Sequence, residues 1–124
     1  MDSKRSAKLS ESLGHLREAR QAFAHRRKGD ALPLLALTKA FEIAVEYAWR
    51  ELKRQAEDEG LDVPSPKSAV RQAARLGWIS DPEAWMEMIE ARNASVHDYF
   101  GIGEADFVKL AGKFLALAEK IKTS

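Results

Sequence analysis

Large apolar side chains recur along this chain at intervals of three, four and seven residues, a spacing that limits the folds it can adopt. Over residues 3–28 this spacing connects Leu9, Leu13, Leu16 and Phe23. Side chains at such intervals share one face of a helix, where they can be buried together. The segment therefore predicts an amphipathic first helix.

Four further segments carry the same pattern or clear helix boundaries. We expect helices over residues 30–59, 65–76 and 104–122, and another that begins at Asp81-Pro82-Glu83, where a capping carboxylate precedes a proline in first position. No segment shows the period-two alternation of a β-strand. The pattern predicts an all-α, antiparallel up-and-down bundle of four to five helices, forming a single domain over residues 1–124.

Two details of this fold can be checked residue by residue. The basic run 25–28 is expected to close the first helix, with Gly29 as its C-terminal cap, because cations are favoured at that end. The second helix, capped by Asp30, has a broad apolar face, so we expect it to be central. The predicted packing positions of the second and third helices are Leu34, Leu35, Leu37, Phe41, Ala44, Val45, Ala48, Trp49, Leu52, Val70, Ala73, Ala74 and Leu76.

The composition excludes several classes of protein. The chain has no cysteine, which excludes disulfides and thiolate metal sites. Residues 2–8 lack the apolar run of a signal peptide, and Lys39, Glu42 and Glu46 interrupt the most apolar stretch, residues 31–49. We therefore expect a cytoplasmic protein without a membrane segment. We also expect no metal and no cofactor, because no metal-ligand spacing or glycine-rich phosphate loop is present.

The charge balance limits the kind of partner. The chain has 20 Lys and Arg against 19 Asp and Glu, a net charge of +1. This balance argues against binding to a long nucleic-acid duplex, which requires an extended basic surface. A compact RNA site remains compatible with it, because an active site needs only one or two well-placed cations.

One segment could carry chemistry. Residues 92–99 bring together Arg, Asn, Ser, His, Asp and Tyr, directly after the amphipathic stretch that begins at Trp85. On a continuous helix Asn93 and His97 share a face, whereas Arg92 and His97 diverge by about 140°. Either the helix distorts near His97, or the two side chains converge on a groove built with another element. A second copy of the same helix in a homodimer could supply that element.

These residue types suit cleavage of an RNA phosphodiester without a metal. His97 titrates near neutrality and could move the proton of a 2′-hydroxyl or of the leaving oxygen. Arg92 offers a planar fork for the phosphate and for the charge that grows in the transition state. Asn93 could support either group. From the residues alone, a helix end whose polar side chains hydrogen-bond to one another and to solvent is the competing interpretation.

The segment resembles the Arg-x4-His motif of HEPN domains, and its extension to Arg-x4-His-x-Tyr is similar to the HepT subgroup, also described as nucleotidyltransferase substrate-binding proteins. The resemblance covers most of the chain, in residues 39–44, 68–73, 77–79 and 85–93 as well as the motif. It implies a helical bundle that dimerises through the motif-bearing region. It also implies a shared endoribonuclease site in which Arg92 and His97 are the catalytic residues and Asn93 is a supporting residue.

The same resemblance implies a partner. HepT-like domains are toxins of type VII toxin–antitoxin pairs, and a nucleotidyltransferase encoded nearby, the antitoxin, transfers AMP groups to the motif tyrosine, which here matches Tyr99. Each AMP adds bulk and negative charge two residues from His97, which would repel an RNA backbone. The chain departs from the family pattern at Phe100-Gly101-Ile102-Gly103, where an acidic residue is expected after the tyrosine.

Three functional hypotheses follow. The first is an RNA-cleaving toxin that acts through Arg92 and His97. The second is a non-catalytic subunit that presents a substrate, or its own Tyr99, to a nucleotidyltransferase. The third is a dimerising helical adaptor in which the motif residues only satisfy one another.

Overall fold

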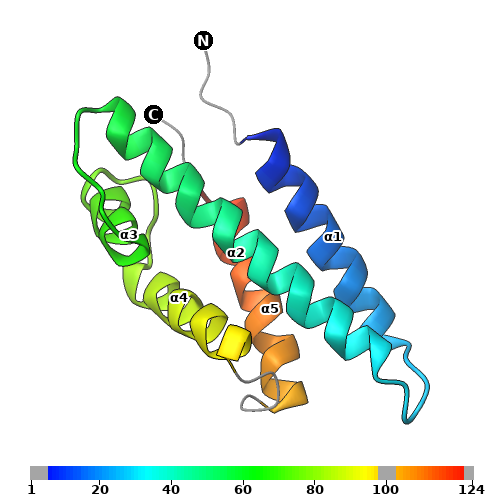
Figure 1. Ribbon diagram of the computed structural model, residues 1–124. Coiled ribbons are helices and arrows are strands. Elements are labelled where there is room, and N and C mark those ends of the chain that lie inside the picture. Colours follow the sequence, from blue (N-terminus) through cyan, green and yellow to red (C-terminus); the bar gives the residue numbers. More distant parts are fainter. Residues whose placement is uncertain (1–5, 98–102, 122–124) are drawn as a thin grey trace.

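The fold, seen in a computed structural model, is a bundle of helices (Figure 1). The structure describes residues 6–97 and 103–121, and the side chains of 6–94 and 103–121. Over these ranges it has five α-helices and no strand, which confirms the all-α prediction. The helices are α1 (Ala7–Ala24), α2 (Leu32–Asp58), α3 (Pro66–Arg75), α4 (Pro82–His97) and α5 (Glu104–Glu119).

The long helix α2 is the centre of the bundle. It runs antiparallel to α1, and α4 and α5 complete the up-and-down arrangement, while the short α3 lies beside one end of α2 (Figure 1). Each of the other four helices contacts α2. The predicted central position of the second helix is therefore confirmed. No described helix is long and apolar enough to cross a membrane.

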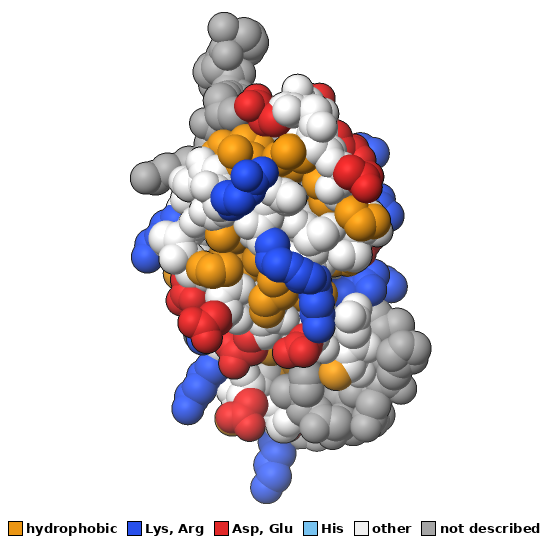
Figure 2. Space-filling view, turned by 90° about the vertical axis from the view of Figure 1, so that its left-hand side faces the viewer, with side chains coloured by type: hydrophobic (Ala, Val, Ile, Leu, Met, Phe, Trp, Pro, Cys, Tyr) orange, Lys and Arg blue, Asp and Glu red, His pale blue; other side chains and the backbone are white. Residues whose placement is uncertain are grey.

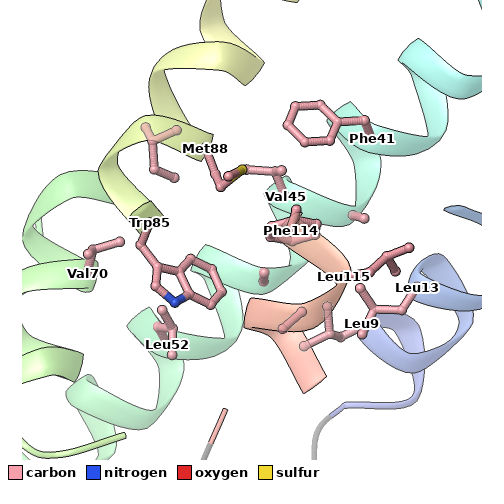
Figure 3. Packing of buried hydrophobic residues seen from close by; sticks show 14 of the residues in the cluster. Leu9, Leu13, Phe41, Val45, Leu52, Val70, Trp85, Met88, Phe114 and Leu115 are labelled. Carbon is pink, nitrogen blue, oxygen red and sulfur yellow. The ribbon is translucent and has the colours of Figure 1, made fainter. Parts of the chain in front are cut away.

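A chain of aromatic rings links α2, α4 and α5 in the core. The rings of Trp85 and Phe114 meet edge to face with centroids 5.7 Å apart, and Phe114 meets Phe41 in the same way at 5.9 Å. Phe41 also contacts Phe107 at 5.1 Å. Such edge-to-face pairs add to the stabilisation gained from burial alone. Figure 3 shows Trp85 and Phe114 among the leucines, valines and Met88 that surround them.

Local hydrogen bonds explain where two of the helices begin. The carboxylate of Asp81 accepts from the backbone N–H of Ala84 at 3.1 Å, which caps α4 as predicted. The hydroxyl of Ser65 accepts from the N–H of Ser68, and Ser68 accepts from the N–H of Ser65 in return. This reciprocal cap fixes the start of α3.

The end of α1 differs from the prediction. The helix stops at Ala24, and the basic run 25–28 lies beyond it rather than in its last turn. Arg26 turns back, places its guanidinium 3.8 Å from the centroid of the Phe23 ring and donates to the Phe23 carbonyl. This contact satisfies a carbonyl that a longer helix would have used. Gly29, with φ of 87°, belongs to the connection and not to a helix cap.

Two predicted packing positions are also wrong. Leu35 is 44% exposed and Leu76 is 37% exposed. Leu35 lies about 160° around α2 from the buried Leu37, so it faces away from the core. Leu76 follows the last residue of α3 and caps that helix. The other predicted positions of α2 and α3 are buried or half-buried.

Candidate functional site

Arg92, Asn93 and His97 lie on the last turns of α4. This helix continues to His97, so a break in its backbone before His97 is not the way in which Arg92 and His97 could converge. The side chain of His97 and the whole of Tyr99 lie outside the described residues. Arg92 and Asn93 are described, and they place the first half of the motif against α2.

Arg92 crosses from α4 to α2. Its Nη2 atom lies 2.9 Å from Oε1 of Glu46, and the two side chains are only 31% and 22% exposed. Asn93 is exposed, and its Oδ1 accepts a long hydrogen bond of 3.4 Å from Nη1 of Arg92. The guanidinium is thus held against α2 by a carboxylate, with the neighbouring amide as a weaker contact.

Glu46 is the centre of a small network. Besides Arg92 it binds Nη2 of Arg50 through its Oε2 atom at 2.7 Å, and its Oε1 accepts from Nε1 of Trp49 at 3.1 Å. A half-buried carboxylate with three donors has both of its oxygens occupied. Since charge-assisted hydrogen bonds are stronger than neutral ones, this network restricts the positions that the Arg92 guanidinium can take.

A groove of about 180 Å³ lies beside this network, between α2 and α4. We call it the α2/α4 groove. Arg92 lines it from α4, and the residues that line it from α2 are Lys39, Glu42, Ile43, Glu46, Tyr47 and Arg50. Glu42 is 6% exposed and lies 3.9 Å from the Nζ of Lys39. The groove therefore combines cations suited to a phosphate with one buried and one half-buried carboxylate.

The predicted site thus acquires residues that the motif alone did not indicate. In the sequence, Lys39, Glu42 and Glu46 are recognisable only as charges that interrupt an apolar stretch. The signal was their spacing, since Lys39, Glu46 and Arg50 fall on one face of α2 and each lies three or four residues from an opposite charge. Lys39, Glu46 and Arg50 mark the strip of α2 that the core does not cover, whereas Glu42 at its edge is buried.

The wider surface around α3 and α4 has charges of both signs. Figure 2 shows acidic and basic side chains interspersed with apolar ones on this face. One turn beyond the groove on α2, a hydrogen bond to Glu51 raises the pKa of Arg54 above its ordinary value; burial opposes this shift, and the charges of Glu51 and Asp58 add to it. Arg54 therefore stays charged, in an ion pair outside the groove.

The described residues contain no group of three or more His, Asp or Glu side chains that could hold a metal ion. The chemistry that the described part of the groove can support is the binding and electrostatic stabilisation of an anion by Arg92, with Lys39 nearby.

The fold and this groove define a class: all-α bundles with a polar site between the second and fourth helices. Over residues 4–124 the chain matches the family model described as "Nucleotidyltransferase substrate binding protein like", and it belongs to that family. A comparison with curated proteins finds no match.

A solved structure confirms the architecture. The chain is similar to a crystal structure of a protein from Thermus thermophilus, with a TM-score of 0.71 and 23% sequence identity. The similarity covers 90% of this chain and 93% of that one. At this identity the likeness shows the fold alone.

Proposed function

We propose that the chain is a HEPN domain of the HepT kind, a metal-independent endoribonuclease that uses Arg92 and His97 and is neutralised by a nucleotidyltransferase. The observation that carries the proposal is the placement of Arg92. Its guanidinium is held by Glu46 at the edge of the α2/α4 groove. A cation fixed before the substrate arrives needs no reorganisation as charge develops on a phosphate.

The proposed roles follow from the side chains. Arg92 binds the scissile phosphate, His97 moves the proton of the 2′-hydroxyl or of the leaving oxygen, and Asn93 supports the arginine. The reaction needs no metal, because attack by the 2′-oxygen on the adjacent phosphorus expels the 5′-oxygen with proton transfer alone. In this proposal residues 1–124 act as one domain.

A homodimer completes the proposed site. Arg92 and His97 diverge on one helix, so an RNA phosphate that contacts both types of residue fits better between two copies of α4. The exposed face of α2 beside the groove supports this arrangement, since Leu32, Leu35 and Ile43 are 71%, 44% and 41% exposed on the same side of the helix as Arg50. Apolar side chains in such a row suit contact with a second copy.

The test is an RNA-cleavage assay with the purified protein in the presence of EDTA. Arg92→Ala and His97→Ala should each lower the rate on the order of 10²–10³-fold, because each removes a group that acts on the reacting phosphate. His15→Ala and Arg71→Ala are matched controls, since both residues are exposed on helices that do not line the groove. If both motif variants cleave RNA at the rate of the unsubstituted protein, the ribonuclease proposal is wrong.

The second candidate is a non-catalytic subunit that presents a substrate or Tyr99 to a nucleotidyltransferase. The family description favours it. The carboxylates of the groove, the buried Glu42 and the half-buried Glu46, also favour it, because they reduce the positive potential that RNA would meet. It predicts a stable complex with the nucleotidyltransferase and no RNA cleavage by the purified protein, in contrast to the first candidate.

Mass spectrometry after co-expression with the nucleotidyltransferase tests the regulatory part of the proposal. The chain has only two tyrosines, Tyr47 and Tyr99, so peptide mapping assigns an added AMP without ambiguity. We expect the AMP on the Tyr99 peptide, and its loss in Tyr99→Phe but not in Tyr47→Phe. An unmodified Tyr99 in the isolated complex would contradict neutralisation by this route.

A further inference from the structure

A second groove lies between α1 and α5 and shares no residue with the α2/α4 groove. Its volume is about 470 Å³. We call it the α1/α5 groove. One wall is polar and the other apolar: Arg17, Arg20 and Gln21 come from α1 together with Ala24, and Val108 and Leu115 come from α5.

Arg20 is the unusual residue of this groove. Its side chain is half-buried, and within the part of the chain that the structure describes it makes no hydrogen bond or ion pair. Its Nε atom is buried without an acceptor. A guanidinium that is partly removed from water is normally compensated by a carboxylate or carbonyl oxygens. The guanidinium of Arg20 lines the groove and, among the described residues, has no protein acceptor.

The neighbouring Arg17 on the same helix has a carboxylate partner that compensates its charge. Its Nη2 atom is paired with Oε1 of Glu119 across the seam between α1 and α5. Arg17 lies one turn from Arg20, so carboxylates are within reach of this face of α1. Arg17 and Arg20 therefore differ: within the described ranges Arg17 has a carboxylate partner and Arg20 has no acceptor.

Gly112 on α5 makes room for the Arg20 guanidinium. A Cβ atom at Gly112 would lie 2.8 Å from Nη2 of Arg20, closer than real Cβ contacts, and 3.0 Å from its Cζ, which is tighter than most of them. Glycine is among the least favourable residues in a helix interior, where Gly112 stands. The glycine thus leaves room for the guanidinium against α5 at the edge of the groove.

We propose that the α1/α5 groove binds an organic phosphate of about the size of a nucleoside monophosphate. Arg20 would bind the phosphate oxygens, because its planar fork fits them and its donors are unused. Gln21 offers an amide to the polar part of the ligand, and Ala24, Val108 and Leu115 offer an apolar wall to its ring. The volume lies within the range of about 300–1,000 Å³ that is typical of small-ligand sites.

The experiment is calorimetric titration of the full chain with AMP, inorganic phosphate and benzoate at constant ionic strength. We expect AMP to bind, inorganic phosphate to bind more weakly because it lacks the apolar body, and benzoate to bind more weakly because it carries one charge. Arg20→Gln should weaken AMP binding by at least about tenfold, the effect of losing a charged hydrogen bond. Arg71→Gln, an exposed arginine on α3, should leave it unchanged.

Gly112→Ala tests the position of the Arg20 guanidinium separately from its charge, because it keeps every charge and displaces only the guanidinium. It should weaken AMP binding several-fold, and circular dichroism melting curves will show that the variants remain folded. An affinity that falls in Arg20→Gln but not in Gly112→Ala would mean general attraction by a positive charge and would overturn the built site. AMP binding that is abolished by Arg92→Gln and unaffected by Arg20→Gln would also overturn the proposal. The absence of AMP binding at millimolar concentration would overturn it as well.

Discussion

Two arginines in this bundle lie in similar places but have opposite surroundings. Arg92 leans from α4 onto α2, and Arg20 leans from α1 onto α5, and each is half-buried at the edge of a groove. Arg92 meets the carboxylate of Glu46 at 2.9 Å. Arg20 meets a glycine and, among the described residues, no acceptor for any of its nitrogens, whereas in Arg92 only the Nε atom is buried without one.

The two grooves would therefore bind an anion in different ways. Around Arg92 the protein supplies a fixed counter-charge, which holds the guanidinium in place and lowers the positive charge that a phosphate would meet. Around Arg20 the protein supplies space instead, and the desolvation of the guanidinium is left uncompensated until an anion binds. The first arrangement favours precise orientation, whereas the second favours affinity.

The largest effect on stability should come from Glu46, the carboxylate that compensates the charge of Arg92. Glu46→Ala should lower the free energy of unfolding by about 2 kcal/mol, because Trp49, Arg50 and Arg92 all lose an acceptor and Arg92 remains half-buried. Urea denaturation of the two proteins measures the change. Glu57→Ala is the matched control, since Glu57 pairs with Lys53 on the exposed side of α2 and should cost under about 1 kcal/mol. Equal losses in both variants would show that Glu46 is no more than a surface charge.

A smaller effect should appear in the coupling free energy between Glu46 and Arg92. A double-mutant cycle of Glu46→Ala and Arg92→Ala should give a coupling free energy of about 1 kcal/mol, because both side chains are largely shielded from water. The same cycle on Arg17 and Glu119, whose side chains are 46% and 44% exposed, should give under about 0.5 kcal/mol. If the second coupling equals or exceeds the first, burial is not what distinguishes the two pairs.

The smallest effect, and one of opposite sign, should come from Arg20. Arg20→Met should raise the free energy of unfolding by about 0.5 kcal/mol, because it removes an uncompensated charge and keeps an apolar side chain of similar length. Thermal unfolding without added phosphate measures it, with Arg27→Met, at an exposed position outside the helices, as control. A loss of more than about 1 kcal/mol would mean that the Arg20 charge already has a stabilising partner in the folded chain.

Much of the fold could be predicted because its signals are local. The Asp81-Pro82 start of α4, the apolar stripe of α1 and the central position of α2 depend on residues within a few turns of one another. The sequence pattern wrongly predicts Leu35, which widens the stripe of α2, and Leu76, at the end of α3, as packing positions. How wide a stripe is covered depends on which helices lie beside it, and that is a property of the whole bundle.

The candidate site was predictable in part for the same reason. Arg92 stands out through its motif, which lies within one segment of α4. Glu46 could not be assigned to it, because the two residues are far apart in the sequence and meet only through the register between α2 and α4. The sequence around Arg20 indicates a site even less, since the features that distinguish it are a glycine on another helix and the absence of an acceptor among the described residues.

The contact between Arg17 and Glu119 joins residues 102 positions apart, so α1 and α5 close the bundle at its longest sequence separation. Neighbouring helices such as α1 and α2 can pair early during folding, whereas a contact of this span must wait for the chain between them to be ordered. We therefore expect the α1/α5 seam to be among the last parts to form and the first to open, with fast amide hydrogen exchange. A ligand bound in that seam would slow the opening of the whole bundle.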